Sequence, residues 1–143
     1  MENLNIIDGI IVGRVEPYIY AFSTNTIPNY LKVGDTYRPL LVRLNEWRNR
    51  FPNLKLEFKC KASINGNVFF RDYSVHEYLE NNLGKLRLLK EDMSRFPTGT
   101  YYSKEFFKDT SSDHLKEAIE DIANSYKKMI ISTGSMIQIR LFQ

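Results

Sequence analysis

The sequence contains a single cysteine, Cys60, and no apolar run long enough to cross a membrane. One thiol excludes an internal disulfide and a zinc site built from several cysteines. A membrane-spanning helix needs about 20 predominantly apolar residues, and no stretch of this sequence approaches that length. The first residues, MENLN, also lack the basic and apolar regions of a secretory signal. We therefore expect a cytoplasmic protein in a reducing compartment, without a membrane partner.

A strong charge of either sign is also missing. The 143 residues carry a net charge of +3 at pH 7, and we find neither repeats nor low-complexity segments. This length predicts one domain, and 43% hydrophobic residues are ordinary for a globular core. The slight excess of lysine and arginine is compatible with a nucleic-acid partner and equally with an ordinary solvated surface.

Alternation of apolar and polar residues predicts several short strands. They cover residues 18–22, 30–34 and 54–62, with residues 6–13 as an apolar lead-in. The polar connection between the first two predicts a hairpin. Because the strands come mostly early and pair antiparallel, the fold class is α+β, with a small central antiparallel sheet flanked by helices.

Apolar residues at helical spacing predict three helices, over residues 39–51, 73–82 and from about 110 to 129. The pattern Thr110-x-x-Asp113 is typical of a helix cap and places the start of the last helix. The segment STGSM, residues 132–136, is expected to end that helix before a final strand.

Short motifs follow one another in a fixed order. The first strand contains Tyr18-Ile19-Tyr20, and Lys32-Val33-Gly34-Asp35-Thr36 lies in and after the second, with eleven residues between them. Arg43-Leu44 follows on the predicted helix, and Glu105-Phe106-Phe107 comes much later. The order and spacing resemble the GIY-YIG nuclease superfamily, in the phage and bacterial branch whose second motif is of the Lys-Ile-Gly type. The resemblance covers about residues 17–107.

The resemblance implies a divalent-metal-dependent endonuclease that hydrolyses phosphodiester bonds of DNA, in a restriction or phage setting. Residues 1–107 would be the nuclease core with its lead-in strand. Residues 108–143 would be a C-terminal helix and tail, packed on the core or leading to a partner domain such as a helicase. The alternative is a non-catalytic nucleic-acid-binding module that kept the fold, since several motif positions depart from the family pattern.

The hairpin supplies four candidate residues. By the resemblance, Tyr20 lies near the attacking water as a candidate general base. Tyr18 replaces a family glycine and shares a face with Tyr20, where it would line the rim of the site and contact substrate. Lys32 stands where many relatives have a tyrosine, and it either holds phosphate as a point charge or is an exposed strand lysine. Gly34 would allow close approach of the backbone.

The first predicted helix supplies the candidate phosphate ligand. Its apolar stripe is formed by Leu40, Leu44, Trp47 and Phe51, so Trp47 is expected in the core. Arg43 falls at the edge of this stripe, where a long side chain can reach over the sheet, and Arg50 lies on the same side. The resemblance implies that Arg43 binds the scissile phosphate; otherwise it is a solvated arginine. Arg38 lies on nearly the opposite face and is the poorer choice.

The second predicted helix carries the candidate metal ligand. The related branch has roughly Glu-x-x-Leu-His here, whereas VHEYLE places His76 and Glu80 in the exchanged order. These two residues are four apart, on one flank of the apolar stripe, while Glu77 faces water. We therefore expect Glu80, with His76, to bind one Mg²⁺ or Mn²⁺ ion. Alternatively, His76 transfers a proton or is a surface residue.

A basic stretch follows the second predicted helix. It contains Arg87 among several cations and is followed by tyrosines, the full set being Lys85, Arg87, Lys90, Arg95, Tyr101, Tyr102 and Lys104. Such a set suits phosphate contacts and base stacking, or an ordinary solvated face. His114 is expected in the first turn of the last helix, exposed to solvent. A test of the whole site is whether Tyr20, Arg43 and Glu80 converge on one open cleft.

Overall fold

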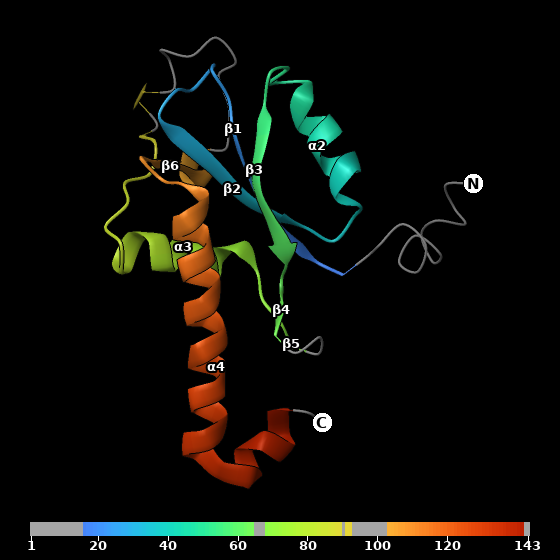
Figure 1. Ribbon diagram of the computed structural model, residues 1–143, viewed down its shortest axis with the longest axis vertical. Helices are drawn as coiled ribbons and strands as arrows, with labels where there is room; N and C mark the ends of the chain where they lie inside the picture. Colours follow the sequence, from blue (N-terminus) through green and yellow to red (C-terminus); the bar gives the residue numbers. More distant parts are fainter. Residues whose placement is uncertain (1–15, 65–67, 90, 93–102, 142–143) are drawn as a thin grey trace, which may run out of the picture.

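A four-stranded antiparallel sheet is the centre of the computed structural model, which describes residues 16–64, 68–89, 91–92 and 103–141 (Figure 1). The strand order is β3-β1-β2-β6. The strands are β1 (Tyr18–Ser23), β2 (Tyr30–Thr36), β3 (Lys55–Lys61) and β6 (Phe106–Lys108). A separate hairpin pairs β4 (Ser63–Ile64) with β5 (Val68–Phe69).

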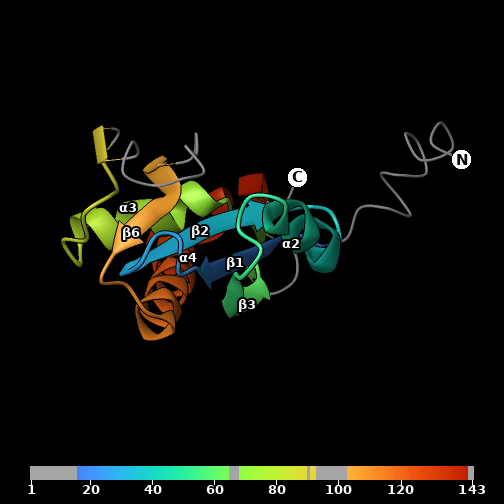
Figure 2. The ribbon, with the colours of Figure 1, turned by 90° about the horizontal axis from the view of Figure 1, so that it is seen from above.

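Helices lie on both faces of this sheet and complete the expected α+β architecture. The helix α2 (Leu40–Arg48) lies apart from α3 (Asp72–Asn81) and α4 (Ser112–Leu141), as two perpendicular views show (Figures 1 and 2). A short 3-10 helix, η3 (Ser103–Glu105), leads into β6. No helix within the described residues is long and apolar enough to cross a membrane.

The side-chain alternation of β1 and β2 divides the core into two clusters. One face of the sheet packs against α3 and α4, in a cluster that includes Ile19, Ala21, Leu31, Val33, Val75, Leu79, Phe107, Leu115 and Ala118. The other face packs against α2, in a cluster that includes Tyr20, Phe22, Leu44, Trp47, Phe51 and Phe106. Successive strand residues point to opposite faces, so Tyr20 and Lys32 share the α2 face. The expected core position of Trp47 is confirmed, since 2% of it is exposed.

The C-terminal part of the chain differs from the prediction. The expected break at residues 132–136 and the expected final strand are both wrong, because α4 continues as one 30-residue helix to Leu141. A single glycine in a helix interior costs only about 1 kcal/mol relative to alanine, so Gly134 does not have to end the helix. The strand β6 was not predicted either, because a run of three residues is too short to show a period. The lead-in segment 6–13 lies outside the described residues.

The first turn of α4 is capped by a residue other than the expected one. The hydroxyl of Thr110 donates to the carbonyl of Lys108 instead of capping the helix. Ser111 precedes the helix, and its backbone N–H donates to Nδ1 of His114 at 3.0 Å. This is one of the two bonds of a capping box, with an imidazole nitrogen in place of the usual glutamate oxygen.

We expect His114→Ala to lower the free energy of unfolding by about 1 kcal/mol, because the Ser111 N–H would lose its acceptor. Urea titration followed by far-UV circular dichroism measures the change. Lys116→Ala, two residues along on the exposed side of α4, is the matched control. Equal stability of the two variants would contradict the capping role.

Candidate functional site

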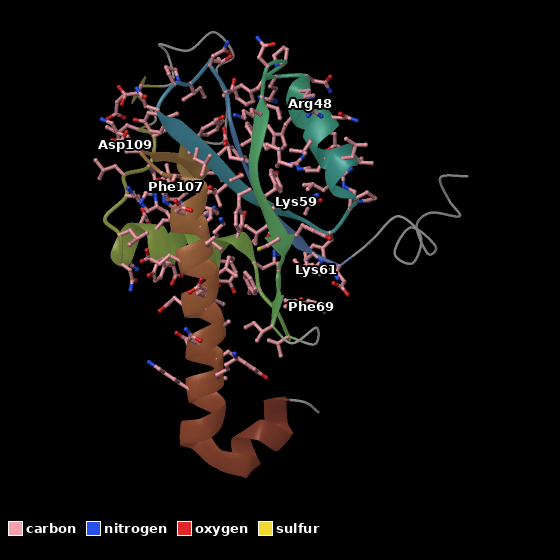
Figure 3. The ribbon with its side chains drawn as sticks, viewed as in Figure 1. Arg48, Lys59, Lys61, Phe69, Phe107 and Asp109 are labelled. Atoms are coloured by element: carbon pink, nitrogen blue, oxygen red, sulfur yellow. The ribbon has the colours of Figure 1, made fainter. Side chains whose placement is uncertain are left out.

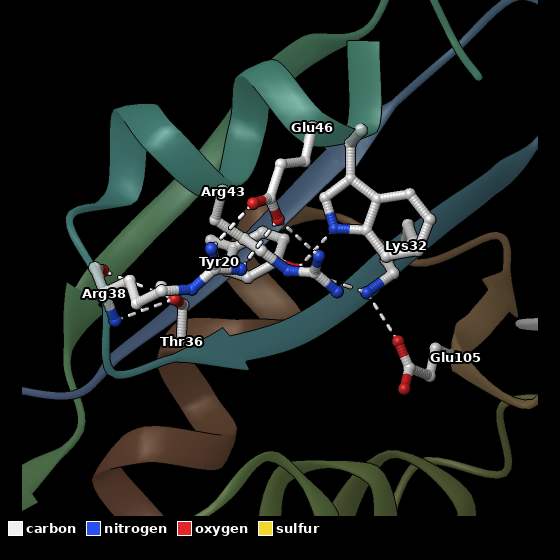
Figure 4. A network of polar contacts seen from close by, with 8 residues as sticks. Tyr20, Lys32, Thr36, Arg38, Arg43, Glu46 and Glu105 are labelled. Atoms are coloured by element: carbon white, nitrogen blue, oxygen red, sulfur yellow. Dashed lines mark hydrogen bonds and ion pairs between the residues drawn. The ribbon is translucent and has the colours of Figure 1, made fainter. Parts of the chain in front are cut away.

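The side chains of Tyr20, Lys32 and Trp47 meet at the Tyr20 phenol, on the sheet face that packs against α2 (Figure 4). Its oxygen accepts a hydrogen bond from Nε1 of Trp47 at 2.7 Å and another from Nζ of Lys32 at 3.3 Å. Each of the three side chains is at most 2% exposed. They come from β1, β2 and α2, so tertiary packing alone brings them together. Two donors fix the position of the phenol oxygen from two directions.

Lys32 is a buried cation, and the alternative of an exposed strand lysine is therefore wrong. Its ammonium forms an ion pair with Glu105 at 2.5 Å and lies 4.2 Å from the centroid of the Trp47 ring. Burial of a charge is costly unless the charge is paired and hydrogen-bonded. The carboxylate, the aromatic face and the phenol together offset this cost.

Gly34 leaves the space that the ammonium occupies. It lies directly across from Tyr20 in the register of β1 and β2. A Cβ at this position would lie 2.5 Å from Nζ of Lys32 and 2.9 Å from the Tyr20 oxygen, closer than packed atoms approach. A side chain at position 34 would therefore force the Lys32 ammonium and the Tyr20 phenol to shift.

Arg43 forms the accessible rim of the same group of side chains. Its guanidinium carbon lies 4.8 Å from the centroid of the Trp47 ring, and Nη1 donates to Glu46 at 2.9 Å. Burial opposes the charged form of Arg43, but the bond to Glu46 and the nearby Tyr20 phenol leave its pKa raised overall. With 27% of its side chain exposed, Arg43 combines a buried stem with a guanidinium that solvent can reach.

Glu46 holds two arginines together. Arg38 binds its carboxylate with two hydrogen bonds of 2.6 and 2.7 Å, and Arg43 binds one of the same oxygens. The bonds from Arg38, and next those from Arg43, lower the pKa of Glu46 to about 2. Helix geometry made Arg38 the poorer choice, but that argument assumed a helical residue. Arg38 precedes α2, so its side chain is free of the helical direction and lies beside Arg43. The backbone N–H of Arg38 is held by the hydroxyl of Thr36 at 3.0 Å.

His76 has a structural position on the edge of β2. The edge strand β6 pairs only with residues 30–32, which leaves the carbonyl of Val33 without a strand partner on that side. Nε2 of His76 donates to this carbonyl at 2.9 Å, and the ring packs 5.1 Å from Phe107. Burial lowers the pKa of His76, opposed by the bond to Val33 and by Asp72. The reading as a surface residue is wrong, because 6% of His76 is exposed.

Glu80 does not join Tyr20 and Arg43. Its carboxylate pairs with the guanidinium of Arg87, at 2.8 Å to Nε and 3.0 Å to Nη2. Arg87 also donates to the carbonyl of Lys104 and lies 5.0 Å from the Phe107 ring, on the sheet face opposite Tyr20. The expected convergence of the three residues on one open cleft is therefore absent.

The residues present do not fit the divalent cation that the resemblance implies. Both oxygens of Glu80 face a fixed cation, and His76 uses Nε2 to hold the backbone. Among the described side chains, no group of three or more His, Cys, Asp or Glu residues could hold a metal ion. The free lone pair of His76 is on Nδ1, and the described residues place no set of three ligands around it, while the Glu80 carboxylate is paired with Arg87.

The other expected substrate contacts are divided among several places. Tyr18 is half-buried and lies across from Thr36, two residue pairs from Tyr20 on the same face. Arg50 is half-buried just after α2. Lys85 donates to the carbonyl of Asp109 and, like Arg87, holds a loop together. Four members of the basic stretch lie outside the described residues: Lys90, Arg95, Tyr101 and Tyr102.

Two members of the network had no role in the sequence analysis. Glu105 was quoted only as part of a motif, yet its carboxylate approaches Lys32 from the end of η3. Trp47 was assigned to the core, and its indole N–H is the donor nearest to the Tyr20 oxygen. The N–H of a buried tryptophan usually finds a hydrogen-bond acceptor, so the predicted burial of Trp47 already indicated that it has a polar partner.

A cavity of about 440 Å³ lies elsewhere, between the β1–β2 connection and the start of α4. It is lined by Ser23, Thr24, Asn29, Tyr30, Leu31, Glu57, Asp109, Thr110, Ser111 and Ser112. Neither Tyr20 and Arg43 nor their bonded partners Lys32, Trp47 and Glu46 line it. The candidate site is therefore a packed polar network with an accessible arginine rim.

We expect Gly34→Ala to lower the free energy of unfolding by about 1–3 kcal/mol, because the new methyl group forces the Lys32 ammonium out of its place. Trp47 is the only tryptophan, so its fluorescence reports both unfolding and the change around the indole ring. The control is Gly84→Asn, at a positive φ that asparagine tolerates and with no atom within 4 Å of the added Cβ. A Gly34→Ala protein with unchanged stability and emission would contradict the assigned role of Gly34.

We expect the stability of the protein to fall as the pH is lowered from about 7.5 to 5.5, because the pKa of His76 in the folded state lies below its unfolded value of 6.5. The unfolded state then binds more protons, so stability present above that range is lost with acidification. His76→Gln keeps a donor for the Val33 carbonyl and should flatten this dependence. Urea midpoints at several pH values measure it, and equal slopes for the two proteins would refute it.

Comparison with known proteins gives no match among protein-family models, curated protein sequences or solved structures.

Proposed function

We propose that this protein binds the phosphate backbone of DNA at Arg43 and hydrolyses a phosphodiester bond beside Tyr20, as a GIY-YIG-like endonuclease. One observation carries the proposal. Tyr20, Lys32 and Arg43 come from three different elements, and all of them contact Trp47. These are the three residues that the resemblance implies for one site. Their arrangement supports the proposal.

Arg43 is the residue that meets the phosphate first. Its guanidinium is partly exposed and always charged, and its planar donors match a phosphate in a bidentate manner. Glu46 presently occupies part of this donor set. A phosphate competes with that carboxylate for Arg43, while the two bonds from Arg38 keep Glu46 ionised and in place.

Lys32 and Tyr20 act behind this rim. Phosphodiester cleavage places additional negative charge on the phosphate oxygens, and a fixed ammonium stabilises that charge without reorganisation. The Tyr20 oxygen would orient or deprotonate the attacking water, which requires hydrogen-bond distance. Since Tyr20 and Lys32 are buried, the substrate has to displace Glu105 from Lys32 before a phosphate or water reaches them. The 28% exposure of Glu105 makes it the accessible side of the ion pair.

A second candidate function is binding of nucleic acid without cleavage. It is favoured by the complete burial of Tyr20 and by the ion pair that occupies Glu80. In this case Arg43 still binds phosphate, and the packed side chains of Tyr20, Trp47 and Lys32 hold the arginine in position. The two functions predict the same effect of Arg43 on binding and differ only in strand cleavage.

We expect the wild-type protein to nick supercoiled plasmid, and Arg43→Ala to lose most of this activity because its phosphate ligand is gone. The losses typical of such electrostatic contacts are about 10²–10³-fold in rate. The matched control is Arg48→Ala, an arginine of the same helix that bonds Asn45 instead of facing Trp47. Agarose gels with Mg²⁺, Mn²⁺ or EDTA measure the nicking.

The outcomes separate the two functions. Absence of nicking by the wild-type protein under every metal condition, together with Arg43-dependent DNA binding, leaves the binding module. Nicking that Arg43→Ala and Arg48→Ala reduce equally contradicts the phosphate role of Arg43. A further variant, Glu80→Ala, tests the metal ligand that the sequence implied: because Arg87 already occupies Glu80, its nicking should equal that of the wild type.

A further inference from the structure

The strand β3 carries two exposed lysines on the face of the sheet that holds the candidate site. Lys59 and Lys61 are labelled along β3 in Figure 3, and both are exposed. In the register of β1 and β3, Lys59 lies across from Tyr20 and Lys61 lies across from Tyr18. Residues directly opposite in an antiparallel pair point to the same face, so both lysines extend on the α2 side.

Two rows of residues therefore cross the sheet side by side. The first row is Lys59, Tyr20 and Gly34, and the second is Lys61, Tyr18 and Thr36. Adjacent strands lie about 4.8 Å apart, and each lysine is thus one strand away from a tyrosine of the site. Beyond Thr36, the second row reaches Arg38, whose backbone N–H donates to the Thr36 hydroxyl. Arg38 binds the carboxylate of Glu46, which also accepts a hydrogen bond from Arg43.

The charges around these lysines favour an anionic partner. Lys61 pairs with Glu16 at 3.3 Å, with 60% and 46% of the two side chains exposed. Such an exposed pair contributes little and exchanges readily for another anion. The single carboxylate of β3, Glu57, lies at the irregularity of the strand and accepts a hydrogen bond from the hydroxyl of Ser23. Lys59 therefore has no acidic strand neighbour on the α2 face of β3.

We propose that Lys59 and Lys61 bind phosphates of the DNA backbone that enters the site at Arg43, so that the bound strand crosses the sheet from α2 to the outer edge of β3. This rests on the proposed function. The chemistry is that of mobile point charges meeting phosphates, which adds affinity without base specificity. Tyr18 lies between the two groups of cations and offers a half-buried aromatic surface beside the strand.

Lysines on an outer strand also serve to prevent pairing with other sheets, and this role has to be separated from DNA binding. The strand itself provides the comparison. Lys55 is exposed on the same edge strand, but it lies across from Ser23 and so points to the opposite face. Protection of the edge involves all three lysines, whereas binding of DNA at Arg43 involves only Lys59 and Lys61.

The test compares two double variants with equal loss of charge. Lys59→Ala/Lys61→Ala removes the proposed contacts, and Lys55→Ala/Lys127→Ala removes two exposed lysines elsewhere, one of them on α4. Fluorescence anisotropy of a labelled DNA duplex, between about 50 and 200 mM salt, gives the slope of log affinity against log salt. We expect the first variant to flatten this slope by about 1.8, which is two phosphate contacts at about 0.9 each, and the second to leave it unchanged.

A single-stranded probe of the same sequence distinguishes the form of the DNA. There the expected change in slope is about 1.4, since each contact contributes about 0.7. If both double variants weaken binding equally, only net charge matters and the proposal is overturned. A wild-type slope in Lys59→Ala/Lys61→Ala overturns it as well, while the proposed function stands if Arg43→Ala still abolishes nicking. A wild-type protein that binds neither probe refutes both.

Discussion

The buried ammonium of Lys32 is the constraint to which its surroundings are fitted. A cation that is 1% exposed needs a carboxylate, an acceptor and a polarisable neighbour, and Glu105, Tyr20 and Trp47 supply these. The requirement fixes elements that are far apart in the chain: η3 has to bring its glutamate to β2, and α2 has to place its indole over the hairpin. It also favours the glycine at position 34, because an added Cβ would lie 2.5 Å from the ammonium nitrogen and would force it to shift.

The network joins stability to the proposed chemistry. The buried groups hold the stem of Arg43 over the Trp47 ring, while the guanidinium stays within reach of solvent and of Glu46. A phosphate ligand gains specificity when its support is rigid, since the donors are then already in place. The polar residues on the opposite face of the sheet have a structural role. There His76 donates a hydrogen bond to the carbonyl of Val33, and Arg87, which pairs with Glu80, packs over the Phe107 ring.

Much of the local structure follows from residue patterns. The strands β1, β2 and β3 and the helices α2 and α3 were predicted within a few residues, because alternation and helical spacing report which side chains are buried. The face shared by Tyr18 and Tyr20 follows from the same alternation. The end of α4 was not predicted, since a glycine lowers helix propensity only slightly and other energies decide the outcome. The strand β6 was missed because its three residues carry no period of their own.

The resemblance proposed Tyr20, Lys32 and Arg43 as one candidate group. The sequence by itself determined the α+β class and the division of polar and apolar faces. These depend on spacing along the chain, which local geometry converts into a direction for each side chain. Tertiary structure alone decided that Lys32 is buried, that Glu105 is its partner and that Glu80 pairs with Arg87 on the sheet face opposite Tyr20. Such pairings join residues distant in sequence, and their energies depend on burial and distance, which no local pattern contains.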